Sequence, residues 1–342
     1  MQETASRRTP LRLLSFLAAT LLALAVWNLV LGVAVGKTPG FRQHPELGRV
    51  LDEGTLVQSE EGFSRTHIGP LGFRNGEIGP KTPGRSRVLC LGDSFTAGFQ
   101  VGDGQTFVDR LRGSLGNGVE VVNAGRDGVG PAAALGAARF YRSLDPDLVV
   151  IEISPNNLKG QMTDPAANFY VVPDAATDFR IVFNRGYAGD SPLLQRFSKL
   201  GRLSALASFP AVKVGVHNLS SMLRSTKELD RQQANAKAPE TLCRWTVRAL
   251  HERFSKLILV YVGQPAYFDP TPPDAQAAFL GDEARKIGVP FLEVAPTLER
   301  HYRETGELAN GFSNSDPGTG HINGLGHRLL AEALAPMVQR AL

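Results

Sequence analysis

A serine stands between two glycines directly after a short apolar run, in the segment Gly92–Gly98 (Gly-Asp-Ser-Phe-Thr-Ala-Gly). The preceding run, Arg87–Leu91, predicts a buried strand, so Ser94 would lie where that strand ends. Open α/β sheets bind ligands at this edge, which would place the Ser94 hydroxyl in a cleft as a nucleophile. The spacing G-x-S-x-x-x-G differs from the G-x-S-x-G elbow of α/β-hydrolases. A structural turn is the simpler alternative, because Gly-Asp-Ser also favours turns.

Two further polar segments follow the next two predicted strands, and a third lies near the C-terminus. These segments are Asn123–Gly128, Ser154–Asn157 and Gly320–His327. If they meet Ser94 at one edge of a sheet, Ser94 would be the nucleophile and His321 its base. The backbone N–H groups of Ser94 and Gly128, with the side-chain amide of Asn156, would then bind the oxyanion of a tetrahedral intermediate.

The set of segments resembles the SGNH/GDSL hydrolase superfamily over about residues 86–157 and 256–342. The residues that match its four blocks are Ser94, Gly128, Asn156 and His321. The resemblance implies a serine esterase. The stretches Gly69–Arg74 and Val101–Asp103 resemble a membrane-anchored, extracytoplasmic branch of this superfamily.

The acid that would orient the histidine departs from the family pattern. The family has an aspartate three residues before the histidine, where this chain has Gly318. Asp316, five residues before His321, is the nearest acid on that side, and the neighbouring glycines would allow the chain to fold back. We expect Asp316 to orient His321, with a backbone carbonyl as the alternative. The third block also differs, with Ser154 in place of glycine and Asn157 in place of aspartate.

Other candidate sites are weaker. His327 lies near the start of a predicted helix, which favours capping or packing over catalysis. No metal and no organic cofactor is implied. Cys90 lies within an apolar run and favours a core position, although a disulfide with Cys243 stays open. A net charge of +4 without a run of basic residues argues against nucleic-acid binding.

The N-terminus predicts a membrane anchor. Leu13–Val35 is a run of 23 uncharged residues, long enough to cross a bilayer as a helix. Three arginines precede it, at positions 7, 8 and 12. They would stay in the cytoplasm and place the chain after Lys37 outside it. A cleaved signal peptide ending near Ala34–Gly36 is the alternative.

After a juxtamembrane segment at 37–84, predicted strands and helices alternate along an SGNH-like domain at 85–342. Predicted strands are Arg87–Leu91, Val119–Val122, Leu148–Ile153, Leu257–Val262 and Pro290–Leu292, and predicted helices are Phe107–Leu115, Ala132–Leu144, Asp274–Ile287 and a last one after Asn323. This alternation predicts a parallel sheet covered by helices on both faces. Together with the family resemblance, it implies a flavodoxin-like α/β fold in three layers. An insertion at about 158–240 is expected to be a lid or substrate-binding subdomain, with a packing appendage as the alternative.

The predicted function is hydrolysis of an acyl or acetyl ester through an acyl-enzyme. The substrate would be a small-molecule, lipid or surface-glycan ester. An O-acyltransferase for a surface glycan shares the first half-reaction and stays open. An inactive, anchored glycan-binding module also stays open, because fold does not fix function.

Overall fold

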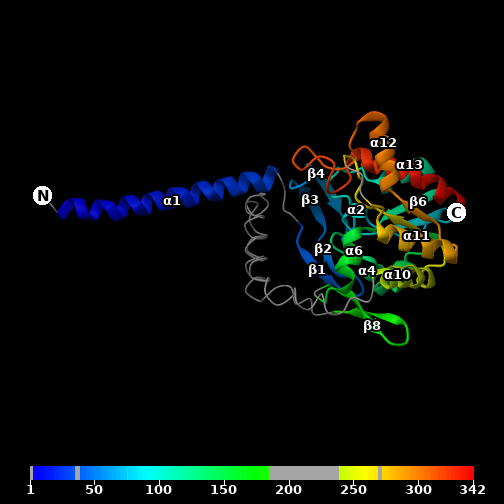
Figure 1. Ribbon diagram of the computed structural model, residues 1–342. Helices are drawn as coiled ribbons and strands as arrows, with labels where there is room; N and C mark the ends of the chain where they lie inside the picture. Colours follow the sequence, from blue (N-terminus) through cyan, green and yellow to red (C-terminus); the bar gives the residue numbers. More distant parts are fainter. Residues whose placement is uncertain (1–2, 35–38, 75, 166, 185–238, 269–271) are drawn as a thin grey trace. The chain divides into compact units, whose positions relative to one another are not determined.

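The structure is a computed structural model of the chain and describes residues 3–34, 39–74, 76–165, 167–184, 239–268 and 272–342. Internal contacts divide the chain into two compact units. The described part of the first unit is a single helix. The described part of the second unit begins at Pro39 and contains all of the other described helices and strands (Figure 1).

The helix of the first unit, α1 (Glu3–Ala34), covers the predicted apolar run. Within it, Arg12–Val30 is long and apolar enough to cross a membrane, and no other described helix meets both conditions. The large apolar side chains between Leu13 and Val30 are exposed. Such a surface suits lipid better than water.

The second unit is built on a five-stranded parallel sheet, whose strand order is β11-β10-β7-β5-β6. The strands are β5 (Ser86–Leu91), β6 (Val119–Asn123), β7 (Leu148–Ile153), β10 (Leu257–Tyr261) and β11 (Phe291–Glu293). All six residues of β7 and all five of β10 are buried. This burial explains why both strands are continuous apolar runs, as strands covered on two faces must be.

Helices cover both faces of this sheet, which confirms the predicted three-layer fold. One core cluster joins the sheet to α4 (Pro131–Gly136), α10 (Pro239–Arg253) and α11 (Ala275–Ile287). The other joins it to α3 (Phe107–Leu115), α12 (Ala295–Thr305) and α13 (Gly324–Ala341). The single predicted helix at 132–144 is two helices, α4 and α5 (Ala138–Ser143), that meet at Ala137.

The predicted juxtamembrane segment contains two β-hairpins between residues 41 and 68, although the sequence shows no sustained periodicity there. Their strands are β1 (Phe41–His44) with β2 (Gly48–Leu51) and β3 (Gly54–Gln58) with β4 (Ser64–Ile68). Leu47 and Phe73 from this segment lie in a core cluster of the sheet, and Ile68 packs with Ala97 and Phe99, which follow Ser94 in the sequence. The segment is thus packed into the second unit.

The region of the predicted insertion begins with α6 (Pro155–Lys159), the short 3₁₀ helix η1 (Gln161–Thr163) and a third hairpin, β8 (Phe169–Asp174) with β9 (Asp178–Phe183). Phe169, Val171 and Phe179 of this hairpin are buried in a core cluster of the sheet. The rest of the predicted insertion, at 185–238, lies outside the described residues, and the lid expected there stays a prediction.

Candidate active site

Ser94 begins the short helix α2 (Ser94–Ala97), which follows β5 with two residues between them. Asp93 caps α2, because its side chain accepts a hydrogen bond from the Phe95 N–H (2.9 Å). Gly98 ends α2 in the left-handed conformation (φ 60°), which glycine adopts without strain. The chain therefore leaves the sheet in one turn of helix, which holds Ser94 at the carboxyl end of β5.

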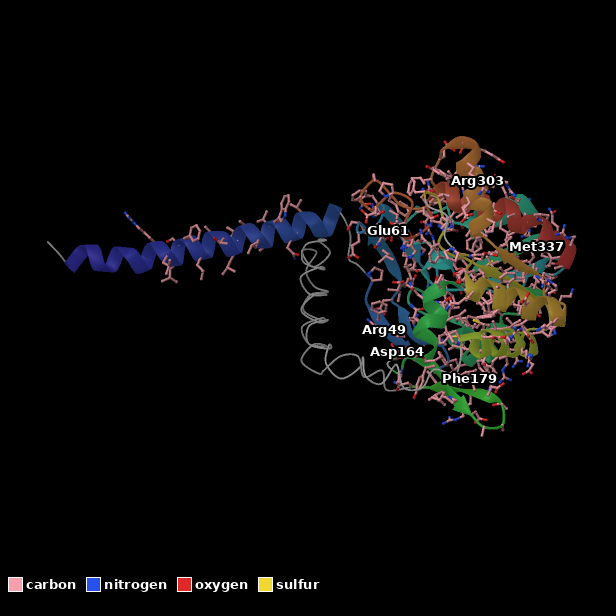
Figure 2. All side chains as sticks on the ribbon, in the orientation of Figure 1. Arg49, Glu61, Asp164, Phe179, Arg303 and Met337 are labelled. Atoms are coloured by element: carbon pink, nitrogen blue, oxygen red, sulfur yellow. The ribbon has the colours of Figure 1, made fainter. Side chains whose placement is uncertain are left out.

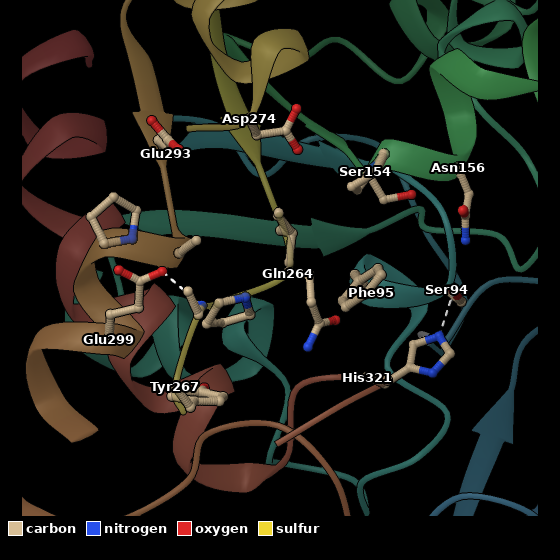
Figure 3. Close-up of a pocket in the computed structure, with 18 of the residues that line it drawn as sticks. Ser94, Phe95, Ser154, Asn156, Gln264, Tyr267, Asp274, Glu293, Glu299 and His321 are labelled. Carbon is tan, nitrogen blue, oxygen red and sulfur yellow. Dashed lines mark hydrogen bonds between the residues drawn. The ribbon is translucent and has the colours of Figure 1, made fainter. Parts of the chain in front are cut away.

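His321 lies against Ser94 in space. Its Nε2 is 2.7 Å from Ser94 Oγ (Figure 3). The ring of Phe95 lies beside the imidazole, with ring centroids 4.8 Å apart. The structure thus brings together the two residues that the sequence predicts as nucleophile and base.

The second ring nitrogen of His321 faces Glu61. Glu61 Oε2 lies 2.5 Å from Nδ1, and Glu61 Oε1 accepts a hydrogen bond from the backbone N–H of His321 (2.7 Å). Glu61 lies in the turn between β3 and β4, 260 residues before His321 (Figure 2). Glu61 therefore occupies the position predicted for Asp316, and the prediction that Asp316 orients His321 is corrected.

Asp316 belongs to a tight turn of its own. Its backbone carbonyl accepts hydrogen bonds from the N–H (3.3 Å) and hydroxyl (3.0 Å) of Thr319, and the residue is exposed. Gly320 has φ +71°, and a Cβ there would lie 2.1 Å from Glu61 Oε1. Gly320 was expected to let the chain fold back and bring Asp316 to the imidazole, but it makes room for the Glu61 carboxylate instead.

The surroundings of Glu61 favour its ionised form. Partial burial acts to raise the pKa of its carboxyl, but the pKa is lowered overall, because the His321 side chain and backbone N–H both hydrogen-bond to the carboxylate. Beside Nδ1, this carboxylate favours the imidazole tautomer with its proton on Nδ1. In that tautomer Nε2 can accept the proton of the Ser94 hydroxyl.

The two departures in the third sequence block are explained by Asp93. Ser154 Oγ donates a hydrogen bond to Asp93 Oδ2 (2.6 Å), and Asn157 Nδ2 donates to the same oxygen (2.9 Å). All three residues are buried. A glycine at 154 would lack the first donor, and an ionised aspartate at 157 would repel Asp93. The residues found here thus satisfy the hydrogen-bonding capacity of the Asp93 carboxylate, directly before Ser94.

Glu152 extends this network into the core. Its Oε2 accepts hydrogen bonds from the Asp93 N–H and from the Thr96 hydroxyl, both at 3.0 Å. Burial raises the pKa of Glu152 well above its usual range, and the charge of Asp93 adds to this effect. A carboxylic acid kept neutral in this way supports the turn at Asp93 without placing a second negative charge there.

Arg74 holds the loop that follows α2. Its buried guanidinium donates hydrogen bonds to the carbonyls of Gly98 and Val101 (2.8 Å for Val101) and lies 3.2 Å from a carboxylate oxygen of Asp103. The two stretches that resemble an anchored branch of the family, Gly69–Arg74 and Val101–Asp103, are therefore in contact. They fix the backbone on the C-terminal side of Ser94.

A cleft of about 1210 Å³ opens at Ser94 and His321. Gly128 and Asn156, the residues predicted to bind an oxyanion, line the same cleft, and Figure 3 shows Asn156 near Ser94. Figure 3 shows Tyr267, Asp274, Glu293 and Glu299 on the side of the cleft away from Ser94. Phe268 and Tyr302 also line the cleft and contact Tyr267, so this lining is both aromatic and acidic.

His327 has a structural role. It is 1% exposed, its Nδ1 accepts a hydrogen bond from the Phe107 N–H at the start of α3 (3.1 Å), and its ring stacks on that of Phe107. Burial, followed by the charges of Arg74 and Arg110, lowers the pKa of His327 to about 3. These contacts agree with the capping and packing role that the sequence favours.

We expect His327 to make the fold less stable in acid. The unfolded chain binds a proton at this histidine below about pH 6.5 and the native chain only below about pH 3. The free energy of unfolding should therefore fall as the pH drops through that window, by on the order of 1.4 kcal/mol per pH unit. Urea unfolding of the wild type and of His327→Gln at pH 7 and pH 5 measures this effect. The variant should lose less stability than the wild type between the two values, and parallel losses would show that His327 is not the cause.

The cysteines do not form a disulfide. Cys90 and Cys243 are both buried free thiols. Burial raises the pKa of each to about 12, so neither is a thiolate at neutral pH. Cys90 is the core residue that its apolar run predicts.

The model of the GDSL-like lipase/acylhydrolase family matches residues 90–329. One similar solved structure is an aryl esterase from M. smegmatis, with 16% identity, a TM-score of 0.35, and coverage of 75% of this chain and 100% of that chain. Another is a carbohydrate acetylesterase from Sinorhizobium meliloti, with 13% identity, a TM-score of 0.34, and coverage of 75% of this chain and 100% of that chain. A putative lipolytic protein from Desulfitobacterium hafniense has 13% identity, with 75% and 100% coverage and a TM-score of 0.34. No curated protein matches the sequence.

Proposed function

The chain belongs to the GDSL-like lipase/acylhydrolase family and is an ester-hydrolysing enzyme, and we propose that it acts through a triad of Ser94, His321 and Glu61. The observation that carries this proposal is an unbroken series of two hydrogen-bond contacts. Ser94 Oγ lies 2.7 Å from His321 Nε2, and His321 Nδ1 lies 2.5 Å from Glu61 Oε2. Nucleophile, base and orienting acid stand in the order that acyl transfer needs.

In the first half-reaction, Nε2 of His321 takes the Ser94 proton as Oγ attacks the ester carbonyl. Glu61 accepts the hydrogen bond from Nδ1–H and stabilises the imidazolium that forms. Collapse of the tetrahedral intermediate breaks the bond to the alcohol, which leaves with the proton from Nε2. Water then attacks the acyl-enzyme through the same steps and releases the acid.

The oxyanion of this intermediate would be bound by the N–H groups of Ser94 and Gly128 and by the amide of Asn156. Two features support this assignment. All three residues line one cleft, and Gly128 has a left-handed φ of +70° with no atom within 4 Å of where a Cβ would lie. Donors preorganised in this way stabilise the charge that develops in the transition state.

The cleft favours a polar alcohol carrying a short acyl group, and therefore a glycan ester over a lipid ester. A long acyl chain would need a continuous apolar wall, but carboxylates at Asp274, Glu293 and Glu299 interrupt the aromatic side chains. Phe268 is 63% exposed, which offers a flat face to a sugar ring. The carboxylates can accept hydrogen bonds from sugar hydroxyls, and they repel phosphate head groups.

A panel of esters tests this function. The full-length protein in detergent should hydrolyse p-nitrophenyl acetate faster than p-nitrophenyl octanoate and palmitate, and it should release acetate from an O-acetylated methyl glucoside. Rates that rise with chain length, together with an intact sugar ester, would favour a lipid substrate. An absence of turnover on every ester would contradict the proposed activity.

We also infer an extracytoplasmic site on a single N-terminal span. The apolar stretch of α1 and the arginines at its N-terminal end support this topology. An alkaline phosphatase fused after Leu342, which is active only outside the cytoplasm, should be active. If the phosphatase fusion is inactive and a cytoplasmic reporter at the same position is active, the C-terminus lies in the cytoplasm and the inferred topology is wrong.

A further inference from the structure

The turn that carries Glu61 is held by one side chain from another part of the chain. Asn314 Oδ1 accepts a hydrogen bond from the Gly62 N–H (2.7 Å). Asn314 Nδ2 donates to the carbonyls of Ser59 (3.0 Å) and Gly62 (3.3 Å). Asn314 therefore binds the backbone on both sides of Glu61 and uses both its donor and its acceptor.

The shape of this turn depends on Gly62. Gly62 has φ +77°, and a Cβ there would lie 2.5 Å from the Gln100 carbonyl and 2.8 Å from the Phe312 ring. The turn is thus confined between the loop after α2 and the loop before His321. Glu61 Oε2 lies 2.5 Å from His321 Nδ1, and a small displacement of the turn would move the carboxylate away from this nitrogen.

Asn314 and His321 belong to the same C-terminal loop. Its base is closed by the bridge between Asn310 and Ile322 and by a hydrogen bond from the Gly311 N–H to the His321 carbonyl (3.1 Å). One end of this loop presents the imidazole to the Glu61 carboxylate, and the tip of the loop binds the Glu61 backbone. The loop thereby sets the distance between acid and base.

We propose that Asn314 is a positioning residue that acts through Glu61, an inference that rests on the proposed triad. It touches neither Ser94 nor the imidazole, and the contacts that join it to the site are those with residues 59 and 62. Its loss leaves the nucleophile and the base in place but frees the turn that holds the acid. The expected consequence is a lower kcat with little change in KM, because the acid acts in the transition state.

A double-mutant cycle separates this role from a general structural one. In full-length protein, Asn314→Ala should lower kcat about tenfold, the effect of roughly one or two lost hydrogen bonds, whereas the neighbouring control Ser313→Ala should leave it unchanged. In a Glu61→Ala background, Asn314→Ala should cost nothing further, because no carboxylate remains to be positioned. Equal losses in both backgrounds, or no loss in either, would overturn the proposal. If Asn314→Ala does not fold, Asn314→Ser serves in the same cycle.

A second measurement does not depend on ester turnover. Hydrogen–deuterium exchange of the peptide that covers residues 59–63 should be about tenfold faster in Asn314→Ala than in the wild type, since the Gly62 N–H loses its acceptor. Unchanged exchange would show that Asn314 does not hold the turn. If exchange is faster in Asn314→Ala but the wild type hydrolyses no ester, Asn314 holds the Glu61 turn and the proposed function is contradicted.

Discussion

Replacing Ser94 by alanine is expected to lower kcat for ester hydrolysis by about 10⁶-fold, the loss seen when a triad nucleophile is removed. The Ser94 hydroxyl lies 2.7 Å from His321 Nε2, and no other hydrogen bond to this nitrogen is found among the described residues. The fold should survive, because the cap of α2 comes from Asp93 and the sheet does not depend on the Ser94 side chain. Turnover of p-nitrophenyl acetate measures the effect.

Circular dichroism and thermal unfolding of the Ser94→Ala protein supply the control. A folded variant that retains near-wild-type turnover would contradict the mechanism as a whole. A variant that is inactive but also unfolded would show instead that the turn after β5 needs the serine hydroxyl.

Replacing Glu61 by glutamine is expected to lower kcat by up to ~10⁴-fold, as for a triad acid that fixes the histidine tautomer. The amide of glutamine can donate to Nδ1, which would leave the ring proton on Nε2. Nε2 could then no longer accept the proton of Ser94, although the two atoms would still lie close together. Steady-state kinetics of the folded variant measures this loss.

Asp316→Asn is the matched control, because it makes the same change from carboxylate to amide in the loop before His321. Asp316 is exposed, and its described hydrogen bonds to Thr319 use the backbone carbonyl, which the substitution keeps. Turnover in this variant should stay near that of the wild type. If Asp316→Asn lost as much activity as Glu61→Gln, Glu61 would not be the orienting acid.

Most of the central sheet could be predicted because its strands are buried on both faces. Leu148–Ile153 is an unbroken apolar run, and the observed strand β7 has the predicted limits. The helix predicted at 107–115 also has its predicted limits, with Thr106 and Asp109 forming a capping box at its start. By contrast, the strands of the hairpins between Phe41 and Ile68 are only four or five residues long, and two of the buried positions of β4 are the polar residues Ser64 and Thr66. Their sequences therefore carry little apolar periodicity.

The site was only partly predictable for a different reason. Ser94 and His321 stand in local motifs, so their neighbours in the sequence reveal them. Glu61 has no such motif, and it meets His321 only because the β3–β4 hairpin folds against the C-terminal loop. The nearby Gly69–Arg74 stretch was the available signal that this segment belongs to the catalytic unit. Proximity in the sequence favoured Asp316, but the carboxylate beside His321 Nδ1 comes from a distant segment of the chain.

The central claim is that Ser94 is a nucleophile activated by His321 and Glu61. The most direct test is reaction of the full-length protein with a fluorophosphonate, followed by mass spectrometry of its peptides. We expect one phosphonyl group per chain, on Ser94, and much slower labelling of folded Glu61→Gln than of the wild type. Label on another residue, or no label on a folded and unmodified protein, would contradict the account.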